Sequence, residues 1–154
     1  MKRVILTLSL SLLSFSLFAK GWAVGGRVTA GVEAQVEYEF ASKNYIEGRL
    51  GVGFMDGASL DFTALYQWNV LNMDWTPTAG EWFFDAGTGI SLGAQSNMYI
   101  GATGCAKLGI KFKAAPVKLA LDYSPSFGSW LGKGNDGFRT DGLFNLGISC
   151  VYCF

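Results

Sequence analysis

Acidic and basic side chains that recur at alternate positions are the residues of this 154-residue chain most able to do chemistry. Carboxylates can act as general acids, general bases or partners of buried cations. We predict that one set of charges shares a narrow interior, where each member must pair or hydrogen-bond because isolated buried charge is costly. The set is Arg27, Glu33, Glu37, Glu47, Arg49, Asp61, Asp85, Lys107, Lys111, Lys118 and Asp122. We expect a structural plug of ion pairs, with a proton path or pore lining as the alternative.

Catalysis is not predicted for these groups. The chain has no histidine, which excludes triads, general bases and metal sites built on that residue. The carboxylates are spread over six segments, and no nucleophile lies beside a base. Cys150 and Cys153 would point to opposite faces of a strand, and Gly87-Thr88-Gly89 lies within a strand pattern. We therefore expect no enzymatic activity, no catalytic residues, no cofactor and no metal.

The first residues are typical of a secretory signal peptide. Lys2 and Arg3 precede an apolar run over 4–18, and Ala19 or Ala23 offers a small residue for cleavage. We predict a cleaved segment over 1–19, with the boundary between 19 and 23, followed by one domain over 20–154. The alternatives are an uncleaved anchor and a buried helix, but the run is short for a membrane-spanning helix.

Period-two alternation of apolar and polar residues predicts the strands that hold the charges. It extends over 46–54, 60–70, 82–92, 98–112, 117–123 and 144–154, with turn residues between these segments. The segment 22–40 is read as one long strand or as two with a turn at 29–31. The second interpretation gives eight strands in total, and bacterial barrels have even strand numbers. The fold class expected is all-β, a closed up-and-down antiparallel eight-stranded transmembrane β-barrel.

The apolar face of this barrel is predicted to point outward. It carries more aromatic side chains than a small lumen can hold, whereas the opposite face is rich in glycine. The rings are Trp22, Tyr38, Phe40, Phe54, Phe62, Tyr66, Trp68, Trp82, Phe84, Phe112, Tyr123, Phe144, Tyr152 and Phe154. A soluble barrel of lipocalin type would reverse the two faces, so the volume of these rings favours lipid outside.

With its leader, its alternating strands and its end at Val151-Tyr152-Cys153-Phe154, the chain resembles the small eight-stranded outer-membrane β-barrel proteins of Gram-negative bacteria. The resemblance implies an outer-membrane location, contact with outer-membrane lipid, both termini in the periplasm, and insertion by the barrel-assembly machinery. It also implies that Phe154 belongs to the terminal assembly signal. Lipid A-editing barrel enzymes of similar architecture use histidine with serine, so the missing histidine argues against that activity.

The expected function is therefore a structural or surface-interaction role without enzymatic activity. Small-solute passage is the alternative, and a lipid-modifying envelope enzyme comes third. We expect a monomer and, without a basic excess, no nucleic-acid partner. The candidate extracellular loop is the long connection over 126–141, with Phe127, Trp130, Lys133, Phe138 and Arg139. A mobile cap over the barrel mouth is the other interpretation of this segment.

Overall fold

The structure, a computed structural model, describes residues 21–53, 59–94, 97–131, 137–139 and 141–154. The predicted signal peptide over 1–19 and Lys133 lie outside these residues. Among the residues described, no helix is long and apolar enough to cross a membrane.

The described fold consists of strands and one short 3-10 turn, η1 (Asp141–Leu143). The strands are β1 (Trp22–Val28), β2 (Gly31–Ala41), β3 (Asn44–Gly53), β4 (Ser59–Met73), β5 (Gly80–Ala94), β6 (Met98–Phe112), β7 (Val117–Tyr123), β8 (Ser126–Leu131), β9 (Phe138–Arg139) and β10 (Leu146–Cys153). The segment 22–40 is thus two strands, separated by Thr29 and Ala30.

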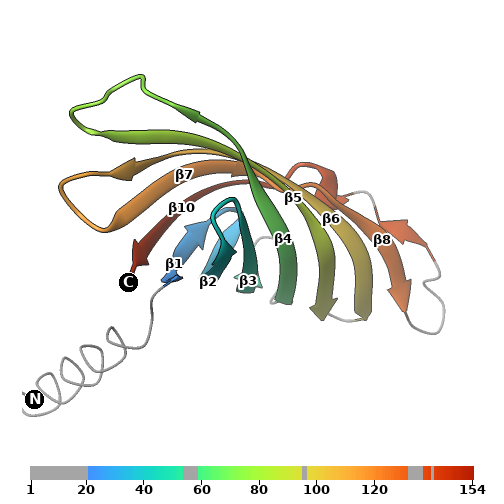
Figure 1. The fold of residues 1–154 in the computed structure, drawn as a ribbon. Helices are drawn as coiled ribbons and strands as arrows, with labels where there is room; N and C mark the ends of the chain where they lie inside the picture. The colour runs from blue at the N-terminus through green and yellow to red at the C-terminus, as the bar shows by residue number, and fades with distance from the viewer. Residues whose placement is uncertain (1–20, 54–58, 95–96, 132–136, 140) are drawn as a thin grey trace, which may run out of the picture.

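The strands form a closed antiparallel barrel (Figure 1). Consecutive strands pair from β1 to β7, and β10 then pairs with both β7 and β1. The first and last strands meet in register, with Ala23 opposite Cys153 and Val28 opposite Ile148. The predicted eight-stranded up-and-down barrel is confirmed, because β7 and β8 occupy one position in the wall.

A proline divides that position. β6 pairs with β7 through its second half and with β8 through its first half. Pro125 has no N–H to give to the ladder, so the strand breaks there while its carbonyl accepts from the Gly104 amide at 2.9 Å. The predicted long connection over 126–141 is therefore wrong at its start, since Ser126–Leu131 belongs to the barrel wall.

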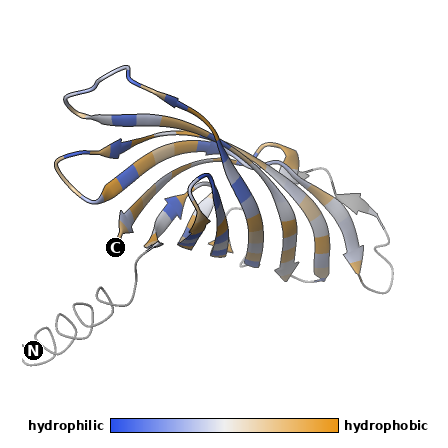
Figure 2. Ribbon diagram, in the orientation of Figure 1, coloured by the Kyte–Doolittle hydropathy of each residue, from blue (hydrophilic) through white to orange (hydrophobic). Residues whose placement is uncertain are grey.

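The two faces of the wall are sharply different in character. Figure 2 shows hydrophobic and hydrophilic bands alternating along the strands. Outward side chains on the eight wall positions are apolar and exposed, among them Val28 at 61%, Leu121 at 54% and Ile148 at 57%. Inward positions carry the buried charges. The predicted orientation of the faces holds throughout the described strands.

The wall is taller on one side than on the other. β4, β5 and β6 have 15 residues each, whereas β1 has 7 and β10 has 8. We call the end where β1 begins and β10 finishes the terminal end; the hairpins β4–β5 and β6–β7 also turn there (Figure 1). The far end is the opposite one, with the turn at Thr29 and the finish of β8.

Candidate functional site

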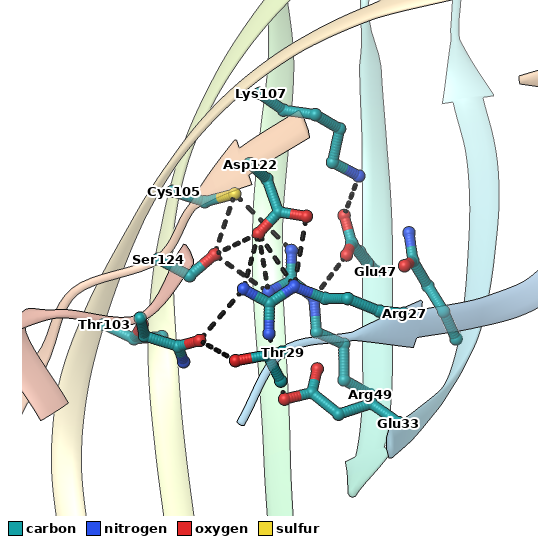
Figure 3. Close-up of polar contacts among 12 residues, drawn as sticks. Arg27, Thr29, Glu33, Glu47, Arg49, Thr103, Cys105, Lys107, Asp122 and Ser124 are labelled. Carbon is teal, nitrogen blue, oxygen red and sulfur yellow. Dashed lines mark hydrogen bonds and ion pairs between the residues drawn. The ribbon is translucent and has the colours of Figure 1, made fainter. Parts of the chain in front are cut away.

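Eight charged side chains form one continuous chain of ion pairs through the lumen. Four carboxylates alternate with four cations in the order Glu33, Arg27, Asp122, Arg49, Glu47, Lys107, Glu37 and Lys118. Figure 3 shows its central part converging from strands on different sides of the barrel. The chain is neutral as a unit, so the lumen holds many ionised groups without net charge.

Arg27 on β1 anchors the end of this chain that lies nearer the far end of the barrel. Its guanidinium lies 2.7 Å from Asp122 Oδ1 and 3.0 Å from Glu33 Oε1, and the side chain is fully buried. It also donates to Asn145 Oδ1 at 3.0 Å. A Cβ at Gly147 would stand 2.5 Å from Arg27 Nε, so only glycine at this position of β10 leaves room for the guanidinium.

Arg49 on β3 crosses the lumen to β6 and β7. Its Nε pairs with Glu47, and its Nη1 donates to Ser124 Oγ at 2.8 Å. Arg49 Nη2 donates a hydrogen bond to Cys105 Sγ at 3.5 Å. Every side of this guanidinium therefore has a partner, as a buried planar donor requires.

Lys107 on β6 links the two remaining acids. Its Nζ lies 2.7 Å from Glu47 Oε2 and 3.1 Å from Glu37 Oε1, and Lys118 Nζ lies 3.0 Å from the other oxygen of Glu37. Both ammonium groups stand over the ring of Tyr45, 5.5 and 5.3 Å from its centroid. The ring adds a cation–π contact to each ion pair.

Two glutamines add hydrogen bonds to two of the acids. Gln35 Nε2 donates to Glu37 at 2.9 Å, and Gln67 Nε2 donates to Glu47 at 3.1 Å. With Ser124 and Cys105 they make the charges part of one polar network. The alternation of the sequence predicts that all four face the lumen, but it did not predict that they join the charge network.

The other three predicted lumen charges stand apart from the chain. Asp85 accepts from the Tyr45 hydroxyl and from Asn69, both at 2.8 Å. Asp61 accepts from Ser59 Oγ at 2.9 Å. Lys111 is exposed at the terminal end. None of the three joins an ion pair within the part of the chain that the structure describes.

The predicted loop residues are placed differently from expectation. Phe127 and Trp130 lie on β8, and Phe138 and Arg139 form β9, which pairs with β8. Trp130 contacts Tyr99, with ring centroids 5.8 Å apart. The loop interpretation is therefore corrected for Phe127 and Trp130.

Phe154, the predicted assembly residue, lies at the seam where the barrel closes. Its amide donates to the carbonyl of Trp22 at 2.9 Å, and its ring meets Tyr152 at 5.1 Å.

Large inward side chains are a further feature that the sequence reasoning missed. Tyr45, Leu65, Phe83 and Tyr99 are all buried in the lumen. Their parity matches that of the charged residues on the same strands, which is the signal that could have identified them. The lumen is thus filled by apolar bulk as well as by ion pairs.

Cavities lie at both ends of the lumen. At the far end a cavity of about 240 Å³ is bordered by Thr29, Glu33, Asp61, Tyr99 and Trp130. At the terminal end, cavities of about 450 and 200 Å³ share Glu39, Tyr45, Lys111 and Lys118 in their walls. The chain of ion pairs lies between the two ends.

The chemistry of the lumen is consequently that of paired charges. Over the described ranges, no three His, Cys, Asp or Glu side chains are grouped so as to hold a metal ion. The chain matches no protein-family model, no curated protein and no solved structure. The geometry of the barrel and its lumen is accordingly the basis for the function proposed below.

Proposed function

We propose that this protein is an outer-membrane β-barrel of a Gram-negative bacterium, with a structural or surface-interaction role and no enzymatic activity. The observation that carries the proposal is the reversal of the arrangement found in soluble proteins. Arg27, Glu47 and Lys107 are almost fully buried, while large aliphatic side chains cover the outside. A continuous apolar exterior around a polar interior suits a hydrocarbon solvent.

Aromatic residues support the same proposal. On the outside near the terminal end, Trp22 packs on Tyr38 with ring centroids 4.7 Å apart, and Tyr66 packs on Trp68 at 5.7 Å. Phe40 continues this group toward Tyr66 at 5.9 Å. Rings gathered at one level of a barrel are typical of the girdles that sit at membrane–water interfaces.

The paired lumen favours a structural role over catalysis. The cations of the chain already have carboxylate partners, and its carboxylates have donors, so moving a proton or binding a substrate there would first break an ion pair. Rearranging such a network is costly because each broken pair leaves an uncompensated buried charge. We assign the interaction role to the far end of the barrel, where the connection between β8 and β10 begins.

Small-solute passage is the second candidate, and the cavities at both ends of the lumen favour it. It requires a path through the central ion pairs, and eight-stranded barrels enclose little free space. Single-channel recording in planar bilayers separates the two candidates. A silent barrel supports the structural role, whereas stable conductance steps that disappear with heat-denatured protein support passage.

Fractionation of cells that express the full chain tests the membrane proposal. We expect the protein in the outer-membrane fraction, resistant to extraction by alkaline carbonate. We also expect faster gel migration before boiling than after, because a closed barrel has no open edge and resists detergent unfolding. Recovery in the soluble periplasmic fraction, with one mobility in both samples, would refute the proposal.

A further inference from the structure

The cavity at the far end has two chemically different walls. Glu33 and Asp61 contribute carboxylates, whereas Tyr99 and Trp130 contribute aromatic rings. Within the described lining, Arg49 is the one cation, and it is already held by Glu47 and Ser124. Among its described lining residues, the cavity therefore presents negative charge and aromatic rings without a free positive group.

The negative charge in this cavity is not balanced by the lumen network. The eight-membered chain of ion pairs is neutral, and Asp61 takes part in none of its contacts. Ser59 satisfies one Asp61 oxygen by hydrogen bonding but brings no charge. Glu33 gives one oxygen to Arg27, while its Oε2 has no hydrogen-bond partner among the described residues. The described lining therefore has a net negative charge that a cation would complement.

A glycine opens the space between the carboxylate and the rings. Gly93 on β5 lies in register between Asp61 on β4 and Tyr99 on β6. A Cβ at Gly93 would stand 2.7 Å from Asp61 Oδ1 and 3.5 Å from Tyr99 Cδ1. The charged group and the ring thus border the same small space, which any larger side chain would narrow.

The aromatic wall continues from Tyr99 to Trp130, its register partner on β8. Their rings are 5.8 Å apart and inclined by 59°. Rings beside a carboxylate favour a cation that carries its own apolar surface, because charge attraction and cation–π contact then act together. A bare metal ion gains little from such a wall and prefers several oxygen ligands.

We propose that the far-end cavity binds a small organic ammonium ion, with Asp61 as its counter-ion and Tyr99 and Trp130 as its aromatic wall. The volume of about 240 Å³ is adequate, since an apolar cavity of about 150 Å³ accepts benzene. This inference goes beyond the structural role and does not require a membrane. Fractionation decides the membrane proposal, and ligand binding decides this one.

Equilibrium dialysis with radiolabelled choline tests the site on the full chain folded in a sugar-based detergent, which brings no choline head group. We expect saturable binding of one choline per barrel. Asp61→Asn should weaken the affinity about tenfold or more, the size of one charge-assisted contact. Glu81→Gln, which removes an exposed carboxylate of β5 near the terminal end, should leave the affinity unchanged.

Two further measurements keep the test decisive if Asp61→Asn fails to fold. The neutral isostere 3,3-dimethylbutan-1-ol should compete at least about tenfold more weakly than choline with the unaltered protein. Gly93→Ala should weaken choline binding by filling the space beside Asp61. The proposal is overturned by the absence of saturable binding, by equal competition from the neutral alcohol, or by displacement of choline by millimolar Ca²⁺ alone.

Discussion

At the scale of single residues, Glu47 is one of three lumen carboxylates, with Glu37 and Asp122, that each contact three other side chains. It holds Arg49 through one oxygen and Lys107 through the other, and Gln67 adds a third contact. Removing its charge leaves two cations facing each other in a site that water does not reach. Glu47 is therefore a position at which the energetic value of the network can be measured.

Glu47→Gln is expected to destabilise the folded barrel by about 3–5 kcal/mol, the cost of breaking a buried ion pair on one side. Urea unfolding in detergent, followed by tryptophan fluorescence, measures the loss. Glu81→Gln is the matched control, because Glu81 is exposed and surface changes cost within about 0.5 kcal/mol. Equal losses in both variants would show that the lumen charges are not energetically coupled.

Leu121 tests the outer face in the same way. Leu121→Arg should cost about 2–4 kcal/mol in lipid vesicles if its position on β7, opposite Ile148, lies at the depth of the hydrocarbon core. Leu71→Arg near the finish of β4 is the control, with about 0–1 kcal/mol expected near an interface. Both leucines are about half exposed. A cost that does not depend on depth would argue against lipid around the barrel.

At the scale of elements, the terminal strand β10 closes the barrel against β1. Deleting Phe154 removes the hydrogen bond from its amide to the Trp22 carbonyl and the ring that packs on Tyr152. We expect the outer-membrane fraction of the protein to fall severalfold in cells, since the seam loses its last contacts. Deleting Lys20 is the control and should have little effect. Normal insertion without Phe154 would mean that the terminal pattern is not read during assembly.

The sequence was sufficient to predict most elements because alternation recurs in each wall strand. It failed at Ser126–Leu131, where the residues are small, aromatic and uncharged, and where Pro125 resembles the start of a loop. Pairing with β6 decides that segment, and this information lies more than twenty residues away. The alternation could have placed Tyr45 and Tyr99 in the lumen, but their residue type gave no support for it, since tyrosine suits either face of a membrane barrel.

The lumen charges were predicted as a set, but their pairing was not. The alternation along a strand predicts which side chains point inward. It does not predict how far along the barrel axis a side chain lies or which other side chain it contacts. Arg27 and Asp122 are 95 positions apart and meet only because β1 and β7 flank β10. Which of the described charges form ion pairs, and which stand apart from them as Asp61 does, depends on the register of the whole barrel.

At the scale of the whole molecule, the orientation of the barrel can be measured. If the termini face the periplasm, the far end faces the outside, and trypsin added to intact cells should cleave after Lys133 or Arg139. Because 71–80 contains no lysine or arginine, chymotrypsin probes this β4–β5 hairpin at the terminal end, and it should cleave after Trp75 only once the outer membrane is opened. The reverse order would invert the barrel and move the candidate interaction surface to that hairpin.

The alternating ion-pair chain also constrains the order in which the barrel can assemble. Its members on β1, β2 and β3 are two bases and three acids, whereas those on β6 and β7 are two bases and one acid. The early and late strands therefore bring opposite net charges of −1 and +1. Neither group alone can enter hydrocarbon with its charges neutralised. If the barrel inserts into a membrane as proposed, we expect insertion and closure to proceed together, with electrostatic attraction between the early and the late strands.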